Sequence, residues 1–148
     1  MESGFYKIYH GGNLVGRRLN ETPDLKPKAI CNKTEDPDAV WVVEALSNGR
    51  YNLYAKGTPV SVPGEIDKRY PDMDLRCGNV EALIIERVDV MEWKLAPVNG
   101  KDDTYLITTG LGYEWMVPEP GKECEIMVMP LSGGETADTL FTFKPVPS

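Results

Sequence analysis

The side chains that could carry out catalysis are few in this sequence. His10 is the single histidine, and it lies in the Gly-rich turn at residues 10–13, where we expect it to be solvated. A serine or cysteine nucleophile needs a neighbouring base, and no nucleophile signature such as G-x-S-x-G accompanies His10. The acidic turns at residues 35–38 and 71–74 lack the loop length and the glycine of a calcium site, and no cluster of nitrogen and sulfur ligands suggests zinc. We therefore expect no enzyme activity, no metal site and no cofactor.

The composition is typical of one folded domain. The chain has 148 residues, of which 41% are hydrophobic and 26% charged, and its formal net charge is −7. A chain of this length buries roughly two-thirds of its unfolded surface, so we expect a single, monomeric domain over residues 1–148. An acidic surface repels phosphate backbones and anionic lipids, and no apolar run approaches the ~20 residues of a membrane span. Neither nucleic acid nor a membrane is an expected partner.

The cysteines and the first residues both indicate a cytoplasmic protein. Cys31, Cys77 and Cys124 are odd in number and show no C-x-x-C spacing. The N-terminal segment contains neither the basic nor the hydrophobic stretch of a signal peptide. We expect three free thiols and a cytoplasmic location.

Short strand-like segments follow one another along the chain, separated by turn residues. Helical periodicity is hard to find, because candidate windows are interrupted by Gly or Pro. Segments of this length at regular spacing indicate an all-β sandwich or barrel. We expect twelve strands, at residues 5–9, 14–19, 29–31, 40–45, 50–55, 59–62, 80–86, 91–96, 104–108, 113–117, 125–129 and 140–144.

Two aromatic patterns each occur three times. In the first, a Tyr follows a turn residue and an aliphatic residue stands two positions later, so that both face the same side of a strand. This pattern begins at Tyr6, Tyr51 and Tyr105. In the second, an aromatic residue stands two positions before another apolar one, at Trp41, Trp93 and Phe141.

The two patterns divide the chain into three units of four strands, at residues 4–48, 49–102 and 103–148. One such unit cannot bury its aromatic face alone, so three must close around a common core. We expect a β-trefoil, in which three hairpins cap a six-stranded barrel; a propeller or an immunoglobulin-like sandwich is the alternative. The predicted core consists of Tyr6, Ile8, Trp41, Val43, Tyr51, Leu53, Trp93, Leu95, Tyr105, Ile107, Phe141 and Phe143.

Five segments spread over most of the chain carry a resemblance to a known family. They lie at residues 15–21, 25–28, 41–51, 92–98 and 113–118. These segments resemble the fungal β-trefoil serine protease inhibitors, the mushroom group that includes cospin and cnispin. The resemblance implies a tight, reversible inhibitor of trypsin-like serine proteases.

The segment at residues 22–29, between the second and third expected strands, has the features of a protease-binding loop. Its two prolines restrict the backbone and favour an extended, preordered conformation, which lowers the entropy lost on binding. Trypsin-like enzymes bind Lys or Arg against a carboxylate in their specificity pocket. Lys26 precedes Pro27, which makes a poor substrate bond, whereas Lys28 is followed by the small Ala29. We predict Lys28 as the primary specificity residue; its alternative is an exposed loop lysine without a role.

Two further residues are expected to belong to this loop or to support it, and a second loop is an alternative protease-binding segment. Leu25 belongs to it, and Asn20, near its base, is expected to brace its backbone through a side-chain hydrogen bond. Lys68, Arg69 and Tyr70, in an insertion of the middle unit, form a second candidate loop.

Two other functions remain open on the same fold. Trefoil lectins usually carry a Gln-x-Trp motif in each repeat, and the corresponding triplets here, at residues 39–41, 91–93 and 139–141, lack the Gln. Mushroom cysteine protease inhibitors, which block a papain-like cleft with different loops, are the second alternative.

Overall fold

The computed structural model describes residues 1–62, 78–84, 91–109, 112–130 and 137–147. Within these residues the chain forms thirteen short strands and one 3₁₀ helix, η1 (Ala137–Thr139). The strands are β1 (Gly4–His10), β2 (Asn13–Arg17), β3 (Lys28–Cys31), β4 (Trp41–Ala45), β5 (Tyr51–Ala55), β6 (Thr58–Ser61), β7 (Gly78–Asn79), β8 (Glu81–Ala82), β9 (Lys94–Pro97), β10 (Thr104–Thr108), β11 (Tyr113–Met116), β12 (Met127–Pro130) and β13 (Phe141–Pro145). No helix in the described part of the chain is long and apolar enough to cross a membrane.

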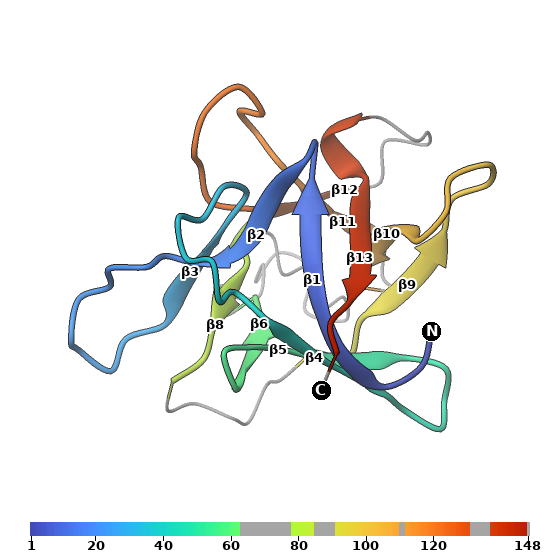
Figure 1. Cartoon of the computed structure of the whole chain (residues 1–148), viewed down its shortest axis with the longest axis horizontal. Coiled ribbons are helices and arrows are strands. Elements are labelled where there is room, and N and C mark those ends of the chain that lie inside the picture. Colours follow the sequence, from blue (N-terminus) through green and yellow to red (C-terminus); the bar gives the residue numbers. More distant parts are fainter. Residues whose placement is uncertain (63–77, 85–90, 110–111, 131–136, 148) are drawn as a thin grey trace, which may run out of the picture.

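The strands pair antiparallel and curl round a common interior (Figure 1). A closed circuit runs from β1 through β2, β3, β8, β6, β5 and β4 back to β1. The last strand, β13, pairs with β1, so the two ends of the chain lie close together. Closure of this kind leaves few unpaired strand edges.

The threefold repeat expected from the sequence is confirmed by strand pairing. The Tyr that begins each unit lies directly opposite the aromatic residue of the second pattern in the same unit. The three pairs are Tyr6 with Trp41, Tyr51 with Trp93, and Tyr105 with Phe141. Each unit therefore closes on itself through the same cross-strand contact, as a β-trefoil requires.

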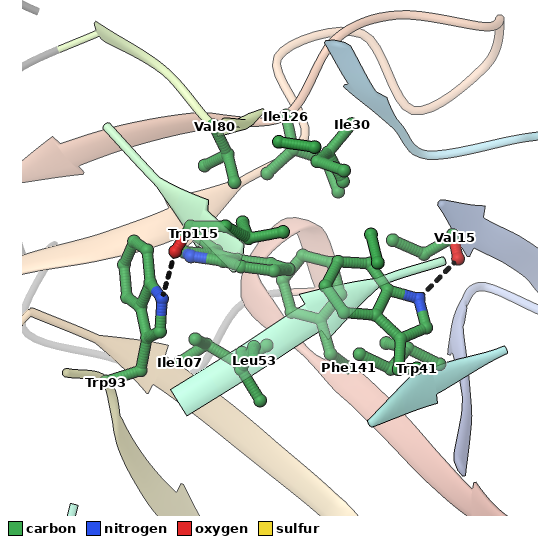
Figure 2. Packing of buried hydrophobic residues seen from close by; sticks show 14 of the residues in the cluster. Val15, Ile30, Trp41, Leu53, Val80, Trp93, Ile107, Trp115, Ile126 and Phe141 are labelled. Carbon is green, nitrogen blue, oxygen red and sulfur yellow. Dashed lines mark hydrogen bonds between the residues drawn. The ribbon is translucent and has the colours of Figure 1, made fainter. Parts of the chain in front are cut away.

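The barrel interior is filled by large aromatic side chains (Figure 2). Trp41 donates its indole N–H to the carbonyl oxygen of Val15 (2.9 Å), and Trp93 makes the equivalent bond to Val60 (3.1 Å). Trp115, fully buried in β11, contacts the aromatic residue of each unit. Its ring centroid lies 6.0 Å from that of Trp41, 5.4 Å from Trp93 and 5.6 Å from Phe141.

Eight of the twelve predicted core residues are buried, and the other four are not. Tyr6, Tyr51, Leu95 and Tyr105 are only partly buried and pack against the outside of the core cluster. A buried tyrosine hydroxyl needs a hydrogen-bond partner, and here Tyr6 donates to the carbonyl oxygen of Glu2 at the surface (2.7 Å).

His10 is not the solvated turn residue that the sequence suggested. It ends β1 and is 5% exposed, and its ring packs against that of Phe141, with centroids 5.4 Å apart and an interplanar angle of 44°. The turn itself is made by Gly11 and Gly12, whose positive φ angles of 55° and 83° are easily adopted by glycine. Because the two glycines make the turn, β1 continues through His10, which pairs with Asn13.

Candidate functional site

The segment between β2 and β3, residues 18–27, projects from the barrel as a long surface loop (Figure 1). We call it the β2–β3 loop. Its base is held by strand pairing, with Gly16 opposite Cys31 and Arg17 opposite Ile30. Gly16 is required there, because a Cβ atom at this position would lie 2.9 Å from the Cβ of Ala39.

The tip of the β2–β3 loop exposes an apolar and a basic side chain next to each other. Leu25 is 63% exposed, more than any other large hydrophobic residue among those described, and Lys26 beside it is exposed as well. Residues 23–26 form bends, so the tip is not the extended segment that the prolines suggested. The bend arises because the Asp24 carboxylate accepts a hydrogen bond from the backbone N–H of Lys26 (3.1 Å).

The predicted exposure of Lys28 is wrong. Lys28 is the first residue of β3, pairs with Ala82 of β8, and is 8% exposed. Its ammonium turns back beneath the loop and donates to the carbonyl oxygen of Thr22 (2.8 Å) and to Oδ1 of Asp24 (2.7 Å). Lys28 is therefore engaged inside the loop, while the flanking Ala29 is half-buried in the strand.

Two arginines anchor the N-terminal side of the loop, Arg17 to the barrel and Arg18 to a neighbouring loop. Arg17 binds both carboxylate oxygens of Glu21 (2.7 and 3.0 Å) and donates to the hydroxyl of Thr58 (2.6 Å). Arg18 forms a salt bridge of 3.0 Å with Glu123. Asn20, which was expected to brace the loop, is exposed. The arginine contacts and the bonds made by Lys28 brace the loop.

A second surface loop, residues 117–126 between β11 and β12, lies next to the first and is reached by the Arg18 salt bridge. We call it the β11–β12 loop. Asn32, which is 1% exposed, donates to the carbonyl oxygen of Lys122 (3.1 Å) and accepts from the N–H of Cys124 (2.8 Å). Lys122 projects outward with 69% of its side chain exposed. Sequence reasoning missed this loop, although two prolines and a glycine before Lys122 marked it.

A cavity of about 330 Å³ lies against the β2–β3 loop, and its charged lining residues are Glu21, Glu81, Glu125, Arg18 and Lys28. Burial raises the pKa of both carboxyl groups, and the charge of Glu81 raises the pKa of Glu125 further, while Arg18 lowers it. Three carboxylates and two cations therefore line the cavity, and the negative charge of Glu81 and Glu125 decreases as the pH falls towards their raised pKa values.

The second candidate loop, with Lys68, Arg69 and Tyr70, lies outside the described residues. Within the described ranges, no group of three or more His, Cys, Asp or Glu side chains is placed to hold a metal ion.

Comparisons with known proteins relate the chain to protease inhibitors. A family model described as peptidase inhibitor I66 matches residues 1–145. A curated serine protease inhibitor from Lentinula edodes is 28% identical over 127 residues, which cover 83% of this chain and 79% of that protein. The solved structure of a proteinase inhibitor from Coprinopsis cinerea matches with a TM-score of 0.78 and 27% identity over 99% of both chains.

A sugar-binding protein shares the architecture at lower similarity. The ricin B-like lectin of Macrolepiota procera, solved in complex with lactose, has a TM-score of 0.68 and 12% identity and covers 99% of this chain and 98% of its own. A likeness at this identity shows the β-trefoil fold alone.

Proposed function

Because the chain belongs to the peptidase inhibitor I66 family, we propose that it reversibly inhibits trypsin-type serine proteases through the β2–β3 loop. One relative is a serine protease inhibitor and another a proteinase inhibitor. We assign inhibition to the β2–β3 loop because its exposed tip is held in place by hydrogen bonds. Leu25 and Lys26 are exposed there, while side-chain hydrogen bonds tie the tip to the base of the loop.

Lys26 takes the place of Lys28 as the residue that we assign to the specificity pocket of the protease. A Lys side chain must extend freely to reach the carboxylate at the base of that pocket. Lys26 is exposed at the tip, whereas the ammonium of Lys28 is bonded to Thr22 and Asp24. Leu25 would contact the protease beside the pocket.

The same loop accounts for inhibition rather than digestion. A preorganised loop loses little conformational entropy when it enters a cleft. Pro27 follows Lys26, and the bond before a proline is a poor substrate for trypsin-like enzymes. If that bond were cut, the strand pairing at Arg17 and the bonds of Lys28 would keep both new ends in place. Slow release of the cleaved loop would then favour religation and a persistent complex.

Titration of trypsin with Lys26→Met tests this proposal. A charged anchor at the centre of an interface contributes strongly, so we expect inhibition to weaken on the order of 100-fold. Lys122→Met is the matched control, since Lys122 is also an exposed lysine on a neighbouring loop. Lys26→Leu should shift the preference towards chymotrypsin-like enzymes. A loss with Lys122→Met but not with Lys26→Met would identify the β11–β12 loop as the reactive one.

A further inference from the structure

The buried ammonium of Lys28 connects the two limbs of the β2–β3 loop. Lys28 lies at the start of the second limb, and its partners, the carbonyl oxygen of Thr22 and Oδ1 of Asp24, lie at the end of the first limb and in the tip. An ammonium that leaves water needs acceptors, because an unpaired buried charge is costly. The burial of Lys28 therefore depends on this loop conformation, and the conformation depends on Lys28.

Asp24 extends the connection to the tip. Its Oδ1 accepts from Lys28 and from the backbone N–H of Lys26 (3.1 Å), and its Oδ2 accepts from the hydroxyl of Thr22 (2.9 Å). Hydrogen bonds to an ionised carboxylate are about twice as strong as those between neutral groups. These bonds lower the pKa of Asp24 to about 2, the bond from Lys28 contributing most, so the carboxylate stays charged at neutral pH.

We propose that Lys28 is a positioning residue of the inhibitory loop, whose ammonium, bonded to Thr22 and Asp24, holds the tip that presents Leu25 and Lys26. The part of this inference that concerns a serine protease bound at the tip rests on the function proposed above. Without the bonded ammonium, the tip samples more conformations and loses more entropy on binding. A protease then binds the loop more weakly and cleaves it faster.

The two roles considered for Lys28 predict opposite effects of a change at Asp24. If Lys28 entered the specificity pocket, it would first have to leave Asp24, so Asp24→Asn would free it and inhibition would improve or stay the same. If Lys28 is a positioning residue, Asp24→Asn weakens the bond that holds the tip, so inhibition falls. Asp24 is 43% exposed at its side chain, so this substitution should leave the fold intact.

The first measurement reports how well ordered the loop conformation is, and it needs no serine protease. Lys28→Met keeps most of the buried aliphatic part of the side chain and removes the ammonium. Asp24→Asn removes the carboxylate charge, and Lys26→Met is the control. Amide exchange of residue 26 is followed by NMR, and cleavage before Leu25 by thermolysin, a metalloprotease that cuts on the N-terminal side of Leu. We expect both rates to rise about tenfold in the first two variants and to stay unchanged in the control. Parental rates in Lys28→Met would overturn the inference.

The second measurement is the inhibition constant for trypsin. Lys28→Met and Asp24→Asn should both weaken inhibition, by a similar factor of about tenfold, and both should be cleaved faster within the loop. Unchanged or stronger inhibition by Asp24→Asn, together with loss in Lys28→Met, would instead make Lys28 the specificity residue. If the parent inhibits no serine protease, the proposed function fails, and the exchange and thermolysin rates still decide whether Lys28 holds the tip.

Discussion

Trp93 and Trp115 meet edge to face in the barrel, with ring centroids 5.4 Å apart and an interplanar angle of 86°. Trp115 lies in the second strand of the third unit. The strand register shows that the equivalent positions in the first and second units are Val15 and Val60. A large side chain thus occupies one of three equivalent positions and packs against the aromatic residues of all three units.

Substitutions of the buried tryptophans should lower the free energy of unfolding by different amounts. Trp93→Ala should lower the free energy of unfolding by about 3–5 kcal/mol, since it leaves a large cavity. Trp93→Phe loses the bond to Val60, whereas Trp115 Nε1 has no hydrogen-bond partner within the described residues. We therefore expect Trp115→Phe to cost less than Trp93→Phe in urea unfolding. The opposite order would mean that the Trp115 indole N–H has a partner in solution.

Asn32 should stabilise the protein through the β11–β12 loop. Asn32→Ala removes two partly buried hydrogen bonds, to the carbonyl oxygen of Lys122 and from the N–H of Cys124, and we expect it to lower the free energy of unfolding by about 1–3 kcal/mol. Asn20→Ala is the matched control on an exposed asparagine, and we expect it to change stability by less than about 0.5 kcal/mol. Chemical denaturation measures both; equal effects would contradict the role assigned to Asn32.

The ion pair between Lys56 and Asp36 predicts a dependence of stability on pH. Lys56 Nζ lies 2.7 Å from Oδ2 of Asp36, and this bond is the largest cause that lowers the pKa of Asp36 below its ordinary value of 3.8. A lowered pKa in the folded state adds stability above pH 3.8, and that stability is lost as the pH falls through the folded-state pKa. Lys56→Met should therefore be less stable than the parent at pH 7, with the difference shrinking below pH 3.8. A difference that is constant with pH, measured by urea unfolding, would argue against the pair.

The two cysteines in the described residues should react at different rates. Cys31 is buried, and burial raises the pKa of its thiol to about 11, whereas Cys124 is partly exposed. Because the thiolate is the reactive form, Cys31 should be alkylated only on unfolding, and Cys124 should react in the folded protein. Mass spectrometry after brief iodoacetamide treatment at pH 8 distinguishes the two sites. Rapid labelling of Cys31 in the folded protein would show that the barrel opens there.

The threefold architecture could be predicted from the amino-acid sequence alone. Alternation of side chains along a strand is a local property, so the pairs that begin at Tyr6, Tyr51 and Tyr105 could be recognised without knowing their partners. The turn residues between the strands are local signals too. The position of the β2–β3 loop between two recognisable strands followed from the same signals.

Which lysine of that loop is exposed depends on the tertiary fold. Pairing of Lys28 with Ala82, distant in sequence, draws it into β3, and the bend closed by Asp24 brings acceptors to its ammonium. The central place of Trp115 likewise depends on all three units meeting at one point. A strand pattern specifies which face a residue is on, but burial and pairing depend on what other segments bring to that face, and this information is not local.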